Sequence, residues 1–141
     1  MNAEQFDIKI RAVEGGVTAA AGFKAAGIHA GFRKNPERLD YALVVPDKPC
    51  PGAGVFTTNR FCAAPVQVSR ANLGGADKGY GVIAGVSVNS GNANAATGET
   101  GLACARETCN IASQVIGCEP QQILVASTGV IGQILPIDTF E

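Results

Sequence analysis

The segment Thr100–Ile116, TGLACARETCNIASQVI, decides the fold because it has the clearest helical pattern in the chain. Its apolar side chains recur every three or four residues, as they do on the buried side of an α-helix. They form one stripe: Leu102, Ala105, Cys109, Ala112, Val115 and Ile116. At the carboxyl end, Gly117 suits the helix cap and Pro120 prevents continuation. The residues that suit the amino end are Thr97, Glu99 and Thr100.

Two apolar segments of strand length flank this helix. Residues 82–88 (VIAGVSV) precede it, and residues 123–126 (ILVA) follow it. The order strand, helix, strand is that of a βαβ unit, which favours two parallel strands. Other strands are predicted over residues 7–11, 41–45, 54–58 and 65–69. We therefore expect a protein of the α/β class.

Length and composition indicate a single domain over residues 1–141. Hydrophobic residues make up 46% of the chain, which is enough to form a core. The 11 basic and 12 acidic side chains are scattered without runs, which argues against a nucleic-acid partner. The first residues, MNAEQFD, lack the basic and apolar parts of a signal peptide, and no apolar run approaches the roughly 20 residues that span a bilayer. We therefore expect a cytoplasmic protein with no membrane partner.

The cysteine and histidine content argues against a metal site. The five cysteines include no C-x-x-C pair, and a single histidine, His29, is present to share a metal with them. We expect the thiols to be small half-buried side chains in a reducing compartment. His29 lies in the apolar stretch GIHAG, where we expect a surface or hydrogen-bonded histidine in preference to a catalytic one. No metal and no cofactor site is predicted.

Two glycine-rich loops follow the strands of the βαβ unit, where ligands of α/β sheets usually bind. The first loop, NSGNANAATG at residues 89–98, leads into the helix and resembles a phosphate cradle. However, it has neither the P-loop ending nor the G-x-G-x-x-G spacing of a nucleotide site. Asparagine amides can bond their own backbone and tolerate left-handed geometry. We therefore interpret this loop as a rigid structural element.

The second loop, STGVIG at residues 127–132, allows three interpretations. Thr128 as a nucleophile would need a neighbouring base, and no His or Lys lies within ten residues of it. Thr128 and Gly129 as an oxyanion hole would place a hydroxyl beside a backbone N–H, with glycine permitting close approach. The segment can also be a simple turn at the end of a strand. The spacing of these residues leaves the three alternatives open.

Four longer motifs assign the chain to a family by resemblance. They are GVTAAAGFKAAGIHAGFR (16–33), AGVFTTNRFCAAPVQVSR (53–70), VNSGNANAATGETG (88–101) and VASTGVIGQILPID (125–138). Their order and spacing resemble those of the ornithine acetyltransferase family, also called bifunctional glutamate N-acetyltransferase/amino-acid acetyltransferases of arginine biosynthesis. The resemblance runs from about Val17 to Asp138 and matches the amino-terminal part of the family's α chain.

This resemblance implies a fold and a reaction. The fold is a mixed sheet packed with helices, a layered sandwich of the self-cleaving amino-terminal-threonine acetyltransferase type, of which this chain holds only part. The precursor cuts itself before an internal threonine into α and β chains, which assemble as α2β2. The freed threonine carries acetyl from N-acetylornithine to glutamate, and some members accept acetyl-CoA as donor. By the matching motif, Thr128 and Gly129 form the oxyanion hole.

The same resemblance leads us to expect a fragment. Family α chains run further than the point that corresponds to Glu141, and Pro136–Asp138 has the pattern of a helix that is cut short. The threonine nucleophile is absent from this chain, so we expect the chain alone to be inactive and to associate through surfaces that the missing part would cover. Two alternatives are a related acetyltransferase or amidohydrolase with another substrate, and a non-enzymatic module that binds an anion at Gly98–Gly101.

Overall fold

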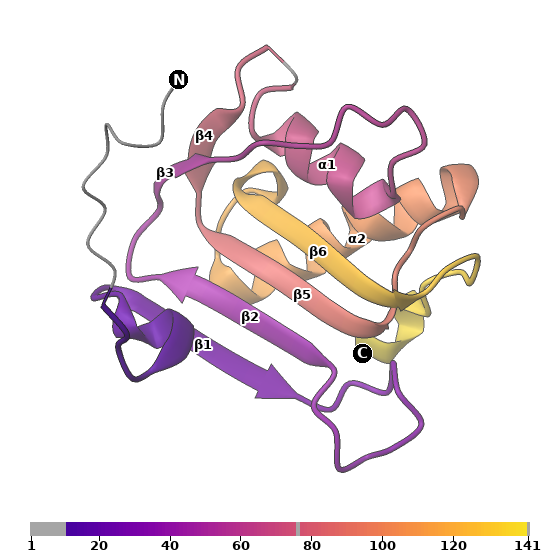
Figure 1. The fold of residues 1–141 in the computed structure, drawn as a ribbon, viewed down its shortest axis with the longest axis horizontal. Helices are drawn as coiled ribbons and strands as arrows, with labels where there is room; N and C mark the ends of the chain where they lie inside the picture. Colours follow the sequence, from indigo (N-terminus) through magenta and orange to yellow (C-terminus); the bar gives the residue numbers. More distant parts are fainter. Residues whose placement is uncertain (1–10, 76, 141) are drawn as a thin grey trace.

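The structure is a computed structural model that describes residues 11–75 and 77–140. Its main sheet has four strands in the order β1-β2-β5-β6, and strands β3 and β4 form a separate two-stranded sheet (Figure 1). The strands are β1 (Phe23–Ile28), β2 (Tyr41–Pro46), β3 (Cys50–Ala53), β4 (Tyr80–Ile83), β5 (Gly85–Asn92) and β6 (Ile123–Val130). The α-helices of the described residues are α1 (Ala64–Asn72) and α2 (Gly98–Ile116). Short 3-10 helices are η2 (Gly16–Ala19), η3 (Pro120–Gln122) and η4 (Ile137–Phe140).

The predicted βαβ unit is confirmed as β5, α2 and β6. Strands β5 and β6 are parallel, and Val88 pairs with Ala126. Helix α2 ends at Ile116, and Gly117 takes the left-handed cap conformation with φ 80°. The predicted strand over 82–88 is divided at Ala84, because its first residues pair with β3 and its last residues join the main sheet.

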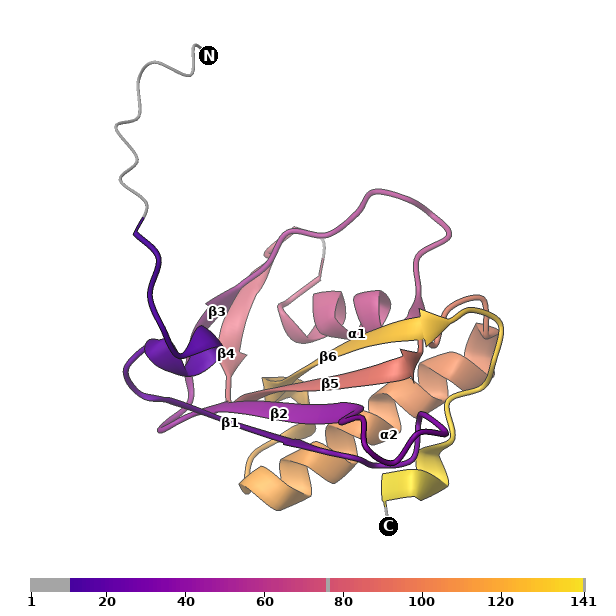
Figure 2. The same ribbon diagram turned by 60° about the horizontal axis from the view of Figure 1, so that its bottom comes forward.

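The sheet is mixed, because β1 and β2 and also β2 and β5 pair antiparallel. Helix α2 packs against one of its faces (Figure 2). On that face, Ser87, Asn89, Ile123 and Val125 are buried. The side chains that alternate with them are half-buried or exposed and apolar: Ala42, Val44, Val86, Val88, Leu124 and Ala126. The second face of the sheet is thus an apolar surface.

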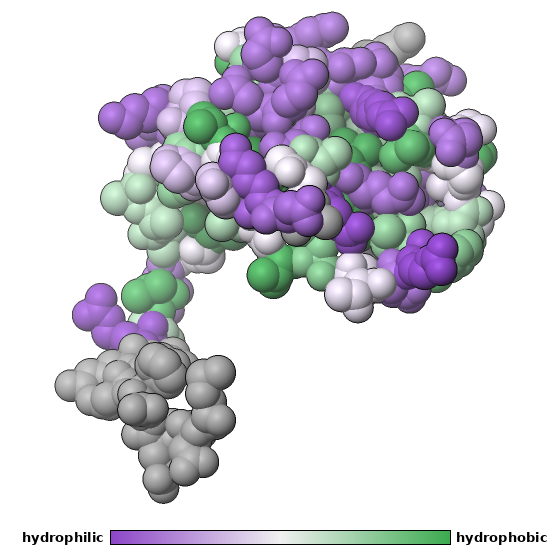
Figure 3. Space-filling model, turned by 90° about the horizontal axis from the view of Figure 1, so that it is seen from above, coloured by the Kyte–Doolittle hydropathy of each residue, from purple (hydrophilic) through white to green (hydrophobic). Residues whose placement is uncertain are grey.

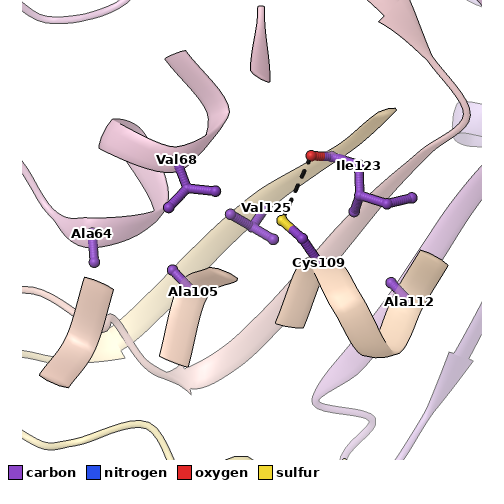
Figure 4. Close-up of a cluster of buried hydrophobic side chains, with 7 residues drawn as sticks. All are labelled: Ala64, Val68, Ala105, Cys109, Ala112, Ile123 and Val125. Carbon is purple, nitrogen blue, oxygen red and sulfur yellow. Dashed lines mark hydrogen bonds between the residues drawn. The ribbon is translucent and has the colours of Figure 1, made fainter. Parts of the chain in front are cut away.

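The core lies where α1, α2 and β6 meet (Figure 4). Its buried side chains are Ala64, Val68, Ala105, Cys109, Ala112, Ile123 and Val125. The apolar stripe predicted for α2 is therefore confirmed in its central part. The prediction is wrong for Val115, which is 73% exposed and borders an open groove beside Ile28.

Helix α1 corrects the strand predicted over 65–69. The alternation of Val66 and Val68 suggested a strand, but Pro65 stands in the first turn of a helix, where its fixed φ is favourable. Ala64 and Val68 then lie one helical turn apart and enter the core together. A short apolar run fits both the period of a strand and the period of a helix, so tertiary packing determines the structure of this segment.

Two other predicted strands lack support in the structure. Residues 54–58 have no regular structure, and the strand that precedes them is β3. Gly54 allows the chain to pass close to Leu73 and Phe56, since a Cβ at Gly54 would lie 2.9 Å from the Leu73 side chain. Of the strand predicted over 7–11, residues 7–10 lie outside the described residues, and Arg11 is not in a strand.

Polar side chains of α1 complete the free edge of β6. Ser69 Oγ donates to the Val125 carbonyl (2.8 Å) and accepts from the Val125 N–H (2.9 Å). Asn72 Nδ2 donates to the Ile123 carbonyl at 2.7 Å. An edge strand exposes unpaired backbone groups, and these bonds satisfy the Ile123 carbonyl and both backbone groups of Val125. Seen from the α1 side, the surface is mostly hydrophilic with apolar residues between (Figure 3).

The carboxyl ends of β5 and β6 meet at a pair of glycines. Gly91 pairs with Gly129, and the register shifts there between Gly91 and Asn92. Gly129 has φ 136°, and a Cβ at this position would lie 2.2 Å from the Gly91 carbonyl carbon. No side chain can occupy that space, so glycine at 129 is required by close approach of the two backbones.

We predict that Gly129→Ala is far more damaging than Gly132→Ala. Gly132 also has a positive φ, 81°, but open space surrounds its missing Cβ, so alanine there costs about 1–2 kcal/mol of backbone strain. Gly129→Ala adds a collision with backbone and is expected to lower the free energy of unfolding by at least about 3 kcal/mol. Urea denaturation of both variants measures the difference, and equal losses would refute the packing argument.

Candidate functional site

Thr128 lies near the carboxyl end of β6, on the exposed part of the strand. Its ladder partner in the parallel sheet is Ser90 of β5. Within residues 11–75 and 77–140, no side chain hydrogen-bonds to the Thr128 hydroxyl, so no base contacts it and the hydroxyl is open to a ligand. Gly129 follows as a second exposed residue without a side chain. Consecutive residues thus offer a hydroxyl and an unshielded backbone at one point of the surface.

The Asn-rich loop is a rigid element, as the sequence predicts. Asn89 Nδ2 donates to the Asn92 carbonyl (2.8 Å), and the Asn94 N–H donates to Asn92 Oδ1 (2.7 Å). Asn94 is fully buried, has φ 45° and donates through Nδ2 to the Gly101 carbonyl at 2.8 Å. Asn92 Nδ2 reaches the Ile134 carbonyl at 3.1 Å. These amides therefore connect the end of β5 to α2 and to the segment after β6.

The start of α2 has little in common with an anion site. Thr97 stands at the cap position, but its hydroxyl donates to Asn94 Oδ1 (2.8 Å) and not to the helix backbone. Glu99 in the first turn already supplies the negative charge that a helix amino end favours. A Cβ at Gly101 would lie 1.8 Å from Thr97 Oγ1, so this glycine is needed for packing.

A groove lies beside the end of β6. It has a volume of about 400 Å³ and is lined by residues 60–64, Gln67, residues 95–99, Leu102 and Ile131. Ile131 follows the Thr128–Gly129 pair closely in the chain. A volume of this size accommodates a small molecule.

Asp40 is a buried carboxylate at the start of β2. Its side chain has no exposed surface, and it accepts hydrogen bonds from the backbone N–H groups of Ala30 (2.6 Å) and Arg33 (2.7 Å). Burial alone would raise the pKa of Asp40, but these donors, the Phe32 N–H and the nearby His29 together hold that pKa below its ordinary value. The carboxylate is therefore charged and fixes the loop 29–33.

His29 and Arg33 extend this arrangement. His29 Nδ1 lies 3.0 Å from the Arg38 carbonyl oxygen and 3.3 Å from Asp40 Oδ2, so the imidazole is hydrogen-bonded, as predicted. The guanidinium of Arg33 donates through Nε (3.0 Å) and Nη2 (2.5 Å) to Ser90 Oγ. Ser90 is thus held on the side of Arg33 and lies beside Thr128 in the ladder.

Arg33 and Ser90 lie inside the motifs over 16–33 and 88–101, but no sequence pattern assigned a role to them or to Asp40. The one available signal was a charged residue placed directly before the apolar strand over 41–45. Its meaning depends on contacts between segments far apart in the chain, since Arg33 and Ser90 are 57 residues apart.

The Cys109 thiol contributes no nucleophile to this region. All five cysteines are free, and Cys109 is buried in the core, where its thiol lies 3.7 Å from the Ile123 carbonyl oxygen (Figure 4). Burial raises the pKa of Cys109 to about 11. The thiol is therefore protonated at neutral pH and serves as an apolar group.

Comparison with known proteins gives one consistent family. A model of the ArgJ family matches residues 24–141. The chain is 47% identical over 126 residues to the arginine biosynthesis bifunctional protein ArgJ of Dehalococcoides mccartyi, covering 89% of this chain and 30% of that protein. The corresponding protein of Thermosynechococcus vestitus is 46% identical over 126 residues, which is 29% of its length. The chain thus spans less than a third of the length of these curated relatives.

Two crystal structures share the fold. The arginine biosynthesis bifunctional protein argJ of Bacillus halodurans superposes with a TM-score of 0.80 at 36% identity, covering 89% of this chain and 63% of that one. The ornithine acetyltransferase of Mycobacterium tuberculosis, crystallised with ornithine, gives a TM-score of 0.79 at 38% identity, covering 88% and 64%. The α/β class with a mixed sheet packed with helices is therefore confirmed. None of the helices in residues 11–75 and 77–140 is long and apolar enough to cross a bilayer.

We predict that Asp40→Asn lowers stability at neutral pH and less so in acid. The pKa of Asp40 is lower in the folded than in the unfolded chain, so its contribution is complete above the ordinary value of 3.8 and is lost as pH falls below it. Hydrogen bonds to charged groups contribute about 1.5–3 kcal/mol, which is the expected loss at pH 7. Urea unfolding from pH 7 downward should show the two proteins converge.

The control is Asp47→Asn, which breaks the exposed ion pair between Lys24 and Asp47 at the far end of the sheet. This variant is expected to unfold at nearly the same urea concentration as the natural sequence, because exposed pairs contribute little. A constant difference between Asp40→Asn and the natural sequence at every pH would contradict the assignment of Asp40 as a buried carboxylate.

Proposed function

This chain belongs to the ArgJ family, and we propose that it is the amino-terminal part of an acetyltransferase of arginine biosynthesis. The complete protein moves acetyl from N-acetylornithine to glutamate, and acetyl-CoA can serve as an alternative donor. The observation that carries the proposal is the position of Thr128 and Gly129: an unbonded hydroxyl beside a bare backbone, at the end of parallel strands, in a chain of this family.

In the proposed mechanism, Thr128 and Gly129 bind the carbonyl oxygen of the acetyl group. The hydroxyl and the Gly129 N–H donate to this oxygen and stabilise the negative charge that develops on it in the tetrahedral intermediate. The same intermediate type forms when the acetyl group enters from N-acetylornithine and when it leaves to glutamate. One pair of donors therefore serves both half-reactions, and neither residue changes protonation state.

The nucleophile is assigned to a second chain. No base contacts Thr128 within the described residues, and an unactivated hydroxyl is a weak nucleophile. An amino-terminal threonine freed by cleavage carries its own base, the α-amine, whose pKa of roughly 8 suits proton transfer near neutrality. We propose that this threonine begins a β chain from the same precursor and that the chains assemble as α2β2.

Two observations support a second chain. This chain covers 63–64% of the crystallised chains but 29–30% of the curated relatives, so the crystallised chains are about half as long as those whole proteins. In addition, the second face of the sheet is apolar and β1 is exposed along its whole length. An apolar sheet face of this kind normally packs against another layer.

We also place the protein in the cytoplasm. All five thiols are free, which suits a reducing compartment. The substrates that we propose are small charged amino acids.

The proposed role of Thr128 predicts a large loss of rate. The test uses the complete protein, produced by co-expressing residues 1–141 with the downstream polypeptide, and measures acetyl transfer from N-acetylornithine to glutamate. Thr128→Ala is expected to lower kcat by about 10²- to 10³-fold, the usual cost of one oxyanion-hole donor. Thr128→Ser keeps the hydroxyl and serves as the control, with most of the rate retained. An unchanged rate in Thr128→Ala would reject the proposed role.

A further inference from the structure

We propose that Arg33 is a positioning residue: held by Asp40 and bonded to Ser90, it fixes the end of β5 and thereby the place of the Thr128–Gly129 donors. This inference rests on the proposed function, because it concerns the reaction in which those donors act. It assigns a task to the loop 29–33, which contributes no group to the acetyl site itself.

The loop is rigid because one buried carboxylate collects its donors. Asp40 accepts from the Ala30 and Arg33 N–H groups at 2.6 and 2.7 Å and lies 3.3 Å from the His29 ring. The Asp40 backbone joins the same arrangement, since its N–H donates to the Ile28 carbonyl at 2.9 Å. Bonds to a buried charge are short and strong, so the loop has little freedom.

Ser90 is held from two sides by this unit. Its N–H donates to the Asp40 carbonyl at 2.8 Å, and its hydroxyl accepts both donors of the Arg33 guanidinium. Guanidinium donors have fixed directions, so a fork on one oxygen defines both its distance and its orientation. Since Ser90 pairs with Thr128 in the parallel ladder, the position of one strand end determines the other.

Close packing carries the constraint one residue further. A Cβ on Gly91 would lie 2.8 Å from the Phe32 carbonyl oxygen and 3.0 Å from Arg33 Cγ. On the other side, the Gly91 backbone presses against Gly129. Phe32, Gly91 and Gly129 therefore form a stack without free space, and a close-packed interior transmits displacements. Displacing the loop displaces the donors.

The experiment is a double-mutant cycle in the complete protein. Arg33→Met removes the fork and keeps most of the side-chain volume. It is expected to lower kcat by about 10- to 10²-fold, the range that misplacement of about 1 Å produces, with KM for both substrates changed by less than about twofold. If Arg33 acts through the placement of Thr128 and Gly129, then Arg33→Met lowers kcat by a smaller factor in the Thr128→Ala background than in the natural sequence.

Three further variants complete the design. Arg38→Met is the matched control, because Arg38 lies between the loop 29–33 and β2 with an exposed side chain, and its rate should equal that of the natural sequence. Arg33→Lys keeps the charge without the fork and should recover only part of the rate. Ser90→Ala removes the shared acceptor with little change of volume, and it replaces Arg33→Met in the cycle if that variant does not fold.

The outcomes separate this inference from the function on which it rests. Thr128→Ala without effect rejects the oxyanion role and the positioning role together. If Thr128→Ala is slow, and Arg33→Met either has no effect or lowers kcat by the same factor with and without Thr128, the oxyanion role stands. The positioning role is then overturned. A loss confined to KM would also overturn it, because that result indicates a substrate contact.

Discussion

The contact between the backbones of Gly91 and Gly129 is the constraint on which the rest of this structure depends. Two parallel strands approach at their carboxyl ends so closely that position 129 admits no Cβ. The approach shifts the register between β5 and β6 at the point where Thr128 emerges. Beyond the contact the two segments run side by side into loops, joined by hydrogen bonds from the Ala93 N–H to the Val130 carbonyl (3.0 Å) and from the Gly132 N–H to the Ala95 carbonyl (2.8 Å).

Polar groups on both sides hold this junction together. Asn92 bonds the segment after β6 through its amide, and Arg33 bonds Ser90 from the opposite side. Each of these groups is satisfied within the protein, whereas the Thr128 hydroxyl has no hydrogen-bond partner among the described residues. Preorganised donors of this kind stabilise charge because they need no rearrangement during the reaction. The architecture thus suits an oxyanion site better than a nucleophile.

Periodic patterns predicted the parts of the fold that are governed by local rules. The prediction of helix α2 is confirmed because its long apolar stripe and the cap residue Gly117 both indicate a helix that ends at the same place. The apolar runs on either side predict the flanking strands. Helix α1 was mistaken for a strand because a short V-Q-V run fits both periods and tertiary packing decides. The hydrogen bonds around Asp40 and Arg33 could not be predicted from the sequence, since they join three segments that only the folded chain brings together. The Thr128–Gly129 pair was found from a hydroxyl beside a glycine and from the family motif, and its role stays a prediction.

Infrared spectroscopy of the acetylated complete enzyme tests the central claim most directly. With a 13C label on the acetyl carbonyl, the difference spectrum isolates one band whose frequency falls as hydrogen bonds to the carbonyl oxygen strengthen. If Thr128 and Gly129 bind that oxygen, the band of the natural enzyme lies at lower frequency than the band of Thr128→Ala. An identical frequency in both proteins would show that Thr128 does not touch the acetyl carbonyl and would contradict the account.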